Sequence, residues 1–425
     1  MVLTRRPPPV RRADDGAGWP AAPVRPSAWY GTPAPAEAPP EESLTIAKFH
    51  APEIMFGEGA LAEAGHAALR LGARRPMLVT DAGLMATPWV EELAGHLRAA
   101  GLSPTVWAEP TPNPKDHEIA AGYECYREAG CDVLIGLGGG SVIDAAKGVA
   151  LLAANGGDIL EFEGVDRSRQ PIPPMVMIPS TAGTGADVSQ FCIVTDTRRN
   201  TKITIIGRTL VPEVSVTDPR LLTTMPDWLA AATGLDALTH GIEAFVSKAH
   251  NPLTDHHALN SIALVNGNLV RSIDCRAERS PRLLMAQASL EAGLAFTNAI
   301  LGAAHAMSHQ VGGLLDLPHG VVNGVLLPHV VRFNARARPE RYVPVARALG
   351  VADERTPATA AGMAVADQVR ALADEVGVPK TLGELGVTAA HVPVLARTTL
   401  HDACLATNPR AATADEIETL FRAAL

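Results

Sequence analysis

The chain has 425 residues, with 36 lysines and arginines against 45 aspartates and glutamates, and a formal net charge of −9. This length is typical of two domains, and a hydrophobic fraction of 47% is ordinary for a globular enzyme. The acidic balance argues against a nucleic-acid partner, because no excess of basic residues is present to neutralise phosphates.

The composition also bears on the cellular location. No run of 18 uncharged apolar residues occurs, so the sequence predicts no membrane span. The five cysteines are odd in number, scattered, and never spaced as CxxC. This pattern is typical of reduced thiols, and it favours a cytoplasmic protein over one with a disulfide framework or a thiolate metal site.

The N-terminal segment differs from the rest of the chain. Ten of the 34 prolines lie within the first 40 residues. Such a segment buries too little apolar surface to offset its ordering entropy, so residues 1–44 are expected to form a disordered extension. Paired arginines occur here, but no apolar stretch follows them, which argues against an export signal.

The remainder divides into two patterns. Between residues 45 and 215, short apolar runs alternate with helical segments. A strand is expected at 76–81, followed by a helix from Trp89 to Ala99; residues 131–154 are expected to form a strand, a glycine-rich turn and a helix, and 173–185 a strand that ends in a Gly/Thr loop. This alternation predicts βαβ units around a parallel sheet, as in dinucleotide-binding domains. From about Pro219 the pattern becomes Ala/Leu-rich and helical, so residues 216–425 are expected to form a second, all-α domain.

Two small-residue loops follow predicted strands. Gly138-Gly139-Gly140-Ser141 opens a helix that carries Asp144, and Ser180–Gly185 reads STAGTG. A glycine-rich turn lets backbone N–H groups approach a pyrophosphate at a helix N-terminus, and ligands of α/β sheets bind at the carboxyl ends of strands. The turn is not the GxGxxG fingerprint, since Ser141 takes the third glycine's place, so a plain tight turn is the alternative.

Asp81 follows the strand expected at 76–81. A carboxylate there could accept hydrogen bonds from a ribose and would repel a 2′-phosphate, which favours NAD over NADP. From local sequence alone, however, a helix N-cap is the stronger interpretation of Asp81.

The histidines give the sharper signal, because eight of the 14 lie within residues 236–330. Asp236 and His240 are four residues apart, as are His305 and His309, and His319 follows. Residues at i and i+4 share one helix face, as two metal ligands must. One carboxylate and three imidazoles suit Fe²⁺ or Zn²⁺ and also accept Mn²⁺ or Co²⁺. Hydrogen-bonded core histidines and a helix-surface pair are the alternatives.

The order of these motifs resembles that of the iron-containing, or group III, alcohol dehydrogenases. The resemblance covers about 380 residues, from Lys48 to the C-terminus. The segments that carry it are GGGSVIDAAK (138–147), STAGTG (180–185), GLDALTHGIEA (234–244), GAAHAMSHQVGGLLDLPHGVVNGVLLPHV (302–330) and DACLATNPR (402–410). One departure is Gly185-Ala186-Asp187, where many members carry Gly-Ser-Glu.

The resemblance implies the fold and the site. The fold would be an α/β NAD-binding domain followed by an all-α metal-binding domain, as in dehydroquinate synthase-like enzymes. The implied metal ligands are Asp236, His240, His305 and His319. His309 would be an extra active-site histidine that relays the hydroxyl proton or holds the substrate. The implied cofactor contacts are Asp81, Asn113, Gly139, Gly140, Ser141, Asp144, Thr181, Thr184 and Lys202.

The expected function is therefore an NAD-dependent alcohol dehydrogenase with Fe²⁺, or Zn²⁺ or another divalent metal. It would transfer hydride between nicotinamide and a small primary alcohol or diol, with an aldehyde as the partner product, and would form a homodimer or larger homo-oligomer. Alternatives are a glycerol-dehydrogenase-like or dehydroquinate-synthase-like relative, and a regulatory homologue without turnover. The absence of Lys and Arg between Leu301 and Val331 counts against a phosphorylated substrate.

Overall fold

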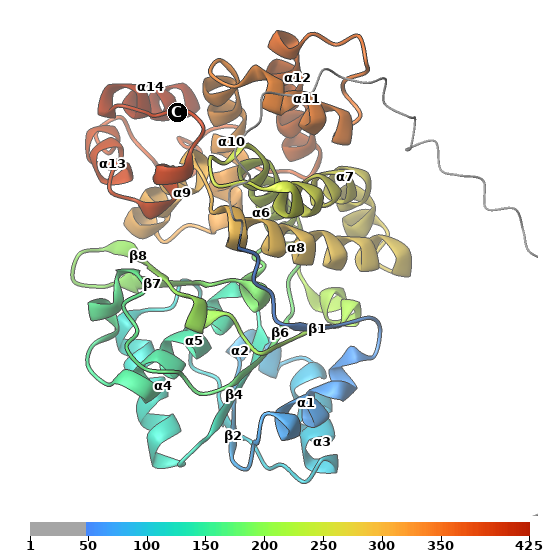
Figure 1. Cartoon of the computed structure of the whole chain (residues 1–425), viewed down its shortest axis with the longest axis vertical. Coiled ribbons are helices and arrows are strands. Elements are labelled where there is room, and N and C mark those ends of the chain that lie inside the picture. Colours follow the sequence, from blue (N-terminus) through green and yellow to red (C-terminus); the bar gives the residue numbers. More distant parts are fainter. Residues whose placement is uncertain (1–47) are drawn as a thin grey trace, which may run out of the picture. The chain divides into compact units, whose positions relative to one another are not determined.

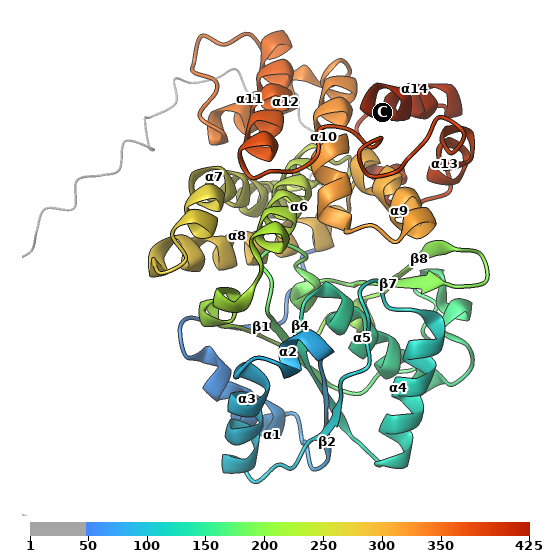
Figure 2. The ribbon, with the colours of Figure 1, turned by 180° about the vertical axis from the view of Figure 1, so that it is seen from behind.

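The computed structural model describes residues 48–425, which form one compact unit. The extension predicted for residues 1–44 lies outside the described residues. Within the described part, the strands and the helices α1 to α5 lie together, and the helices α6 to α14 form the other layer (Figures 1 and 2). None of the helices in this part is both long enough and apolar enough to cross a membrane.

A six-stranded sheet forms the centre of the first layer. Its order is β1-β9-β6-β4-β2-β3 and all its neighbours are parallel, which confirms the expected βαβ architecture. The bounds of its strands are β1 Glu53–Phe56, β2 Pro76–Val79, β3 Thr105–Trp107, β4 Val133–Gly138, β6 Met175–Pro179 and β9 Val214–Thr217.

Helices cover both faces of this sheet. Because side chains alternate along a strand, Val133, Ile135 and Leu137 of β4 face one apolar core and Leu134 faces the other. The helices and 3₁₀ turns of this layer are η1 Ala60–Glu63, α1 Ala64–Arg70, α2 Ala82–Met85, α3 Trp89–Ala99, α4 Asp116–Glu128, α5 Gly140–Asn155, η2 Ile159–Phe162, η3 Ala186–Val188, η4 Arg208–Leu210 and η5 Pro219–Thr224.

A second sheet, which the sequence analysis did not predict, extends the first layer toward the helical one. It consists of β5 (Gly164–Val165), β8 (Thr201–Ile206) and β7 (Phe191–Asp196), with β7 and β8 antiparallel. The hairpin of β7 and β8 carries Lys202 and packs against α5 and α9.

From Pro219 to Leu425 the described residues form helices and connecting segments. At the centre is α6, whose residues 231–246 are all buried against α7, α8 and α10. The bounds are α6 Asp227–Val246, α7 Pro252–Asp274, α8 Arg279–Ala299, α9 Ala303–Leu315, α10 His319–Ala335, α11 Pro339–Ala348, α12 Ala358–Glu375, α13 Val392–Thr399, η6 Ala403–Thr407 and α14 Ala414–Ala424. Residue 215, the predicted domain boundary, lies within β9, and the division into domains 45–215 and 216–425 stays a prediction.

Candidate metal centre and cofactor cleft

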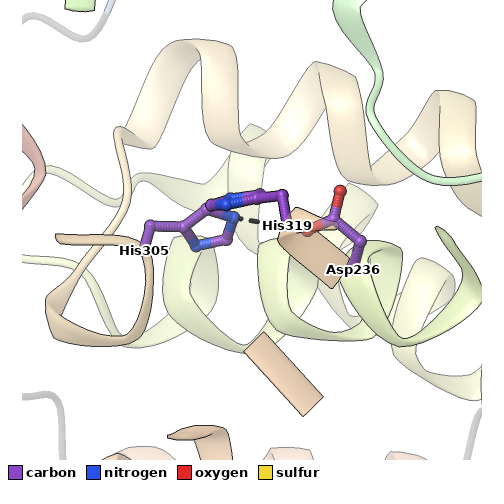
Figure 3. A group of neighbouring side chains, drawn as sticks. All are labelled: Asp236, His305 and His319. Carbon is purple, nitrogen blue, oxygen red and sulfur yellow. Dashed lines mark ion pairs between the residues drawn. The ribbon is translucent and has the colours of Figure 1, made fainter. Parts of the chain in front are cut away.

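Three of the four predicted metal ligands meet in the helical layer. Asp236 of α6, His305 of α9 and His319 of α10 bring their ligand atoms within 4.8 Å of one another (Figure 3). Nε2 of His305 lies 3.7 Å from Oδ1 of Asp236. Asp236 and His305 are almost fully buried, so this is a preformed cluster inside the fold.

The fourth predicted ligand, His240, lies next to this group. Its ring stacks on that of His305 with 4.5 Å between centroids, and its other face lies 4.4 Å from the ring of Phe296. Asp236 and His240 both lie in the fully buried part of α6 and line the same cleft. The structure thus gathers all four side chains, while their roles as ligands stay a prediction.

The hydrogen bonds of the three imidazoles fit a metal centre. Nδ1 of His240 donates to the carbonyl of Gly183 over 3.1 Å, and Nδ1 of His305 contacts Glu243 over 2.6 Å. Nδ1 of His319 contacts Oγ of Ser308 over 2.9 Å. When Nδ1 is held in this way, Nε2 is left to bind a cation, as is usual for metal-binding histidines. The donor set of one carboxylate and three imidazoles therefore fits a divalent metal.

The charges in the cluster point the same way. Burial opposes ionisation of Asp236, but His240 and the hydrogen bond from His305 hold the pKa of this carboxyl well below its usual value. Burial lowers the pKa of His240 to about 4. Burial also disfavours the charged form of His305, yet Asp236 and Glu243 outweigh it and raise its pKa to about 9. A cation that binds Nε2 of His305 would therefore displace a proton.

His309, the predicted proton relay, lies beside the cluster. Its ring stacks on that of His319 at 5.0 Å, and its Nδ1 lies 2.8 Å from Oδ2 of Asp402. His309, Asp402 and Cys404 form a second group of three potential ligands. Burial, however, raises the pKa of the Cys404 thiol well above its usual value, so the sulfur stays protonated. We interpret this group as a hydrogen-bonded His–Asp pair.

A cleft of about 770 Å³, partly open to solvent, joins this cluster to the first layer. Six predicted cofactor residues and all five predicted metal and relay residues line it, namely Asn113, Gly140, Ser141, Asp144, Thr184, Lys202, Asp236, His240, His305, His309 and His319. The structure thus places the glycine turn and the pair of Asp236 and His240 at one cleft, although these two motifs are about 100 residues apart in the sequence.

The glycine turn has a steric reason. Gly139 is the N-cap of α5, and a Cβ on Gly140 would lie 2.8 Å from Cγ2 of Thr184, which is too close. The STAGTG loop therefore packs directly on the turn. This close approach leaves the N-terminus of α5 facing the cleft, where backbone N–H groups favour an anion.

Three predicted cofactor residues do not line the cleft. Gly139 is the N-cap residue that precedes Gly140. Thr181 lines a separate small cavity, and its buried hydroxyl has no hydrogen-bond partner within the described part of the chain. The side chain of Asp81 accepts a hydrogen bond from the backbone N–H of Leu84 and caps α2, as the alternative interpretation predicted.

Two charged residues of the GGGSVIDAAK motif behave differently from phosphate contacts. Burial raises the pKa of Asp144 to about 7, although Lys147 opposes this shift. Lys147 is fully buried, and its Nζ donates to the carbonyls of Ser189 and Phe191, so it ties α5 to β7. Lys202, in contrast, reaches the cleft, where Nζ donates to Oδ1 of Asn113 over 2.7 Å.

Sequence reasoning missed the residues that hold the histidines in place. Glu243, Ser308 and Asp402 contact the ligand and relay histidines, and Asn323 donates to Oδ1 of Asp236 over 2.8 Å. The motifs quoted above contain all four residues. No spacing rule singled them out, because their partners lie on other helices.

Comparisons with known proteins decide the family. Residues 51–219 match the model described as iron-containing alcohol dehydrogenase, and residues 230–425 match the model of the C-terminal part of the same family. The chain belongs to the iron-containing alcohol dehydrogenase family. This result confirms the resemblance, the oxidoreductase class and the cofactor expectation, since the family uses NAD and a divalent metal.

Relatives and solved structures agree with the family assignment. The chain is 41% identical over 372 residues to a 1,3-propanediol dehydrogenase of Citrobacter freundii, covering 87% of this chain and 96% of the relative. It is 38% identical to an NAD-dependent methanol dehydrogenase of Bacillus methanolicus, covering 89% and 99%. The crystal structure of a 1,3-propanediol oxidoreductase has a TM-score of 0.87 at 37% identity and covers 90% of this chain and all of that one. The predicted fold class is thereby confirmed.

Proposed function

We propose that this member of the family oxidises a small, uncharged primary alcohol or diol with NAD and a divalent metal, or reduces the corresponding aldehyde. The observation that carries the proposal is the cleft, which joins the N-terminus of α5 to a cluster of one carboxylate and three imidazoles. Asp236, His240, His305 and His319 would hold the metal. The family relatives named for propanediol and methanol support a small alcohol.

The residues of the cleft have separate roles in the proposed reaction. When bound, a divalent metal supplies Lewis acidity to the alcohol oxygen and NAD supplies the hydride acceptor. Gly140, Ser141 and the N-terminus of α5 would hold the pyrophosphate, and Lys202 would reach the ribose. Asp402 keeps a proton on Nδ1 of His309, so Nε2 is left to exchange a proton with the substrate hydroxyl.

The walls of the cleft indicate the substrate class. Phe296, Leu301 and Ile193 contribute apolar surface beside the histidines, which favours exclusion of water during the reaction. Among the described residues that line the cleft, Lys202 is the single lysine or arginine. A phosphorylated or carboxylated substrate would want more basic partners, so a neutral alcohol is favoured.

A combined metal and turnover assay tests the proposal. Protein purified without oxygen should contain divalent metal and reduce NAD with short primary alcohols or diols. Asp236→Ala should lose both metal and activity, because it removes the single carboxylate of the donor set. Asp227→Ala is the matched control, since Asp227 lies on the same helix, α6, but pairs with the exposed Arg276.

Two results would contradict the proposal. Retained metal in Asp236→Ala would exclude the ligand assignment, and metal binding without turnover on any alcohol would favour the regulatory alternative.

A homo-oligomeric assembly and a cytoplasmic location remain predictions. The five cysteines are free thiols, which is consistent with a cytoplasmic location.

A further inference from the structure

Glu243 is a buried carboxylate that contacts His305, one of the predicted metal ligands. It lies on α6, seven residues after Asp236 and three after His240, so the three side chains share one face of the helix. Only 2% of Glu243 is exposed to solvent. A buried carboxylate is costly unless it is fully hydrogen-bonded, so its partners show what it does.

All the partners of Glu243 belong to the start of α9. Oε1 accepts from the backbone N–H of Ala304 over 2.7 Å, and Oε2 accepts from the N–H of Gly302 over 3.0 Å. Oε2 also contacts Nδ1 of His305 over 2.6 Å. The carboxylate therefore caps the positive end of α9 and holds a predicted metal ligand at the same time.

The backbone fixes this position of the carboxylate. A Cβ on residue 302 would lie 2.8 Å from Oε1 of Glu243 and 2.9 Å from Oδ1 of Asn408, so a larger residue than Gly302 would displace one or both side chains. Because Oε1 and Oε2 both bond to main-chain groups, the carboxylate cannot follow a rotation of the imidazole of His305. The ring must instead adapt to the carboxylate, and its Nε2 then faces Asp236.

The charge of Glu243 also matters. Asp236 and Glu243 bring two negative charges to buried positions at the cluster. The negative charge of Glu243 favours a cation at the cluster, and its loss would remove part of that attraction.

We propose that Glu243 is a positioning residue that sets how tightly the centre holds its divalent metal. It acts by fixing the proton of His305 on Nδ1, by aiming Nε2 into the cluster and by balancing charge, and it does not itself bind the metal. This inference rests on the proposed ligand set of Asp236, His240, His305 and His319.

The test measures Zn²⁺ affinity in metal-stripped protein by competition with a chromophoric chelator. Glu243→Gln keeps the shape of the side chain but removes its charge and replaces one acceptor by a donor. Since partners behind a metal-bound histidine are typically worth 10- to 100-fold in metal affinity, Glu243→Gln should weaken Zn²⁺ binding by about that factor. Turnover per bound metal at saturating Zn²⁺ should fall much less.

Two controls separate this role from a structural one. Asn408 caps the same turn by accepting from the N–H of Ala303 over 3.1 Å, and no contact joins it to His305 in the described residues. Asn408→Ala should therefore lower thermal stability without the loss of Zn²⁺ affinity. Glu291 contacts Nδ1 of His257, a second Glu–His pair between α7 and α8, so Glu291→Gln should leave Zn²⁺ affinity unchanged.

The outcomes distinguish the inference from the function on which it rests. If the wild-type protein fails to bind Zn²⁺ at one ion per chain, the ligand assignment itself is wrong. If the wild type binds Zn²⁺ and the Zn²⁺ affinity of Glu243→Gln is within about twofold of the wild-type affinity, the loss is far smaller than expected and Glu243 is not a positioning residue. An equal loss in Asn408→Ala would also overturn the inference, because the effect would then come from the start of α9.

Discussion

Nδ1 of His309 lies 2.8 Å from Oδ2 of Asp402, a residue 93 positions further along the chain. Both side chains are buried, and the backbone N–H of Cys404 donates to the other carboxylate oxygen over 2.9 Å. Burial disfavours the charged carboxyl, but the neighbouring His309 and these hydrogen bonds lower the pKa of Asp402 below its usual value. Asp402 is thus an ionised acceptor that fixes the orientation and tautomer of His309.

The first prediction concerns this pair. Asp402→Asn should lower kcat by roughly 100-fold, the lower end of the range for a positioned proton transfer, because the amide no longer fixes the proton on Nδ1. KM for the alcohol and the metal content should change little, since His305 and His319 keep their own partners. Steady-state kinetics and metal analysis on the same samples provide the measurement.

Gln310→Ala is the control for this prediction. Nε2 of Gln310 also donates to Oδ2 of Asp402, over 3.3 Å. Within the described residues, no hydrogen bond joins Gln310 to the imidazole of His309. Its kcat should stay near that of the wild type. A kcat for Asp402→Asn close to the wild-type value would show that His309 needs no such partner.

The sequence predicts the layers of this fold well because their patterns are local. The apolar runs of β2, β4 and β6 are buried on both faces, and such runs are typical of a parallel sheet. The hairpin of β7 and β8 escaped prediction. Burial alternates along both strands, but the apolar run at the start of β7, 191–194, is too short for periodicity to distinguish a strand from a helix.

The site was predictable only in part, for a related reason. Spacing along one helix brings Asp236 and His240 together, and a local turn marks Gly140 and Ser141. The carboxylates behind the histidines come from elsewhere: Glu243 reaches His305 across 62 positions, and Asp402 lies in the C-terminal motif. Such pairs exist only after the helices have packed, and no periodicity in the sequence encodes them.

The second prediction concerns Asp81, whose proposed role in cofactor choice competes with its role as the cap of α2. Asp81→Ser removes the carboxylate but keeps an oxygen that can accept from the N–H of Leu84. If the charge of Asp81 repels a 2′-phosphate, Asp81→Ser should raise kcat/KM with NADP and lower it with NAD.

Asp81→Gly, compared with Asp81→Ser, tests whether loss of the cap contributes to the change in cofactor preference. It removes both, but glycine at an N-cap costs only a few tenths of a kcal/mol relative to a side-chain cap, so the two variants should show similar cofactor preference and similar thermal stability. An NADP-to-NAD ratio of kcat/KM that stays at the wild-type value in both variants would leave Asp81 with the capping role alone.

The third prediction is that NADH binding to the metal-free protein weakens as pH rises from about 6.5 to 9. Three groups of the cleft titrate within or at the edge of this range: burial raises the pKa of Asp144 to about 7 and lowers that of Lys202 to about 8, while Asp236 and Glu243, which outweigh burial, raise that of His305 to about 9. Below pH 7, Asp144 is neutral and Lys202 is charged, which suits a dianionic cofactor. Above pH 8, Asp144 is negative and Lys202 is neutral, and both changes disfavour it.

The size of the effect follows from the charges involved. A unit pair about 4 Å apart is worth about 1 kcal/mol in water and about 4 kcal/mol near a protein surface, so we expect NADH to bind roughly tenfold or more weakly at the upper pH. The neighbouring charges that act on Lys202 are Asp316, Asp144, Asp236 and Lys115.

Paired variants locate the source of this pH dependence. Lys202→Arg stays charged throughout the range, and Asp144→Asn does not titrate, so each variant should remove one part of the slope whatever its affinity at pH 6.5. NADH fluorescence titrations across pH provide the data. If the wild-type affinity is flat between pH 6.5 and 9, the charges of Asp144 and Lys202 do not act on the bound cofactor. If most of the slope survives in the double variant, other titrating groups such as His305 cause the pH dependence.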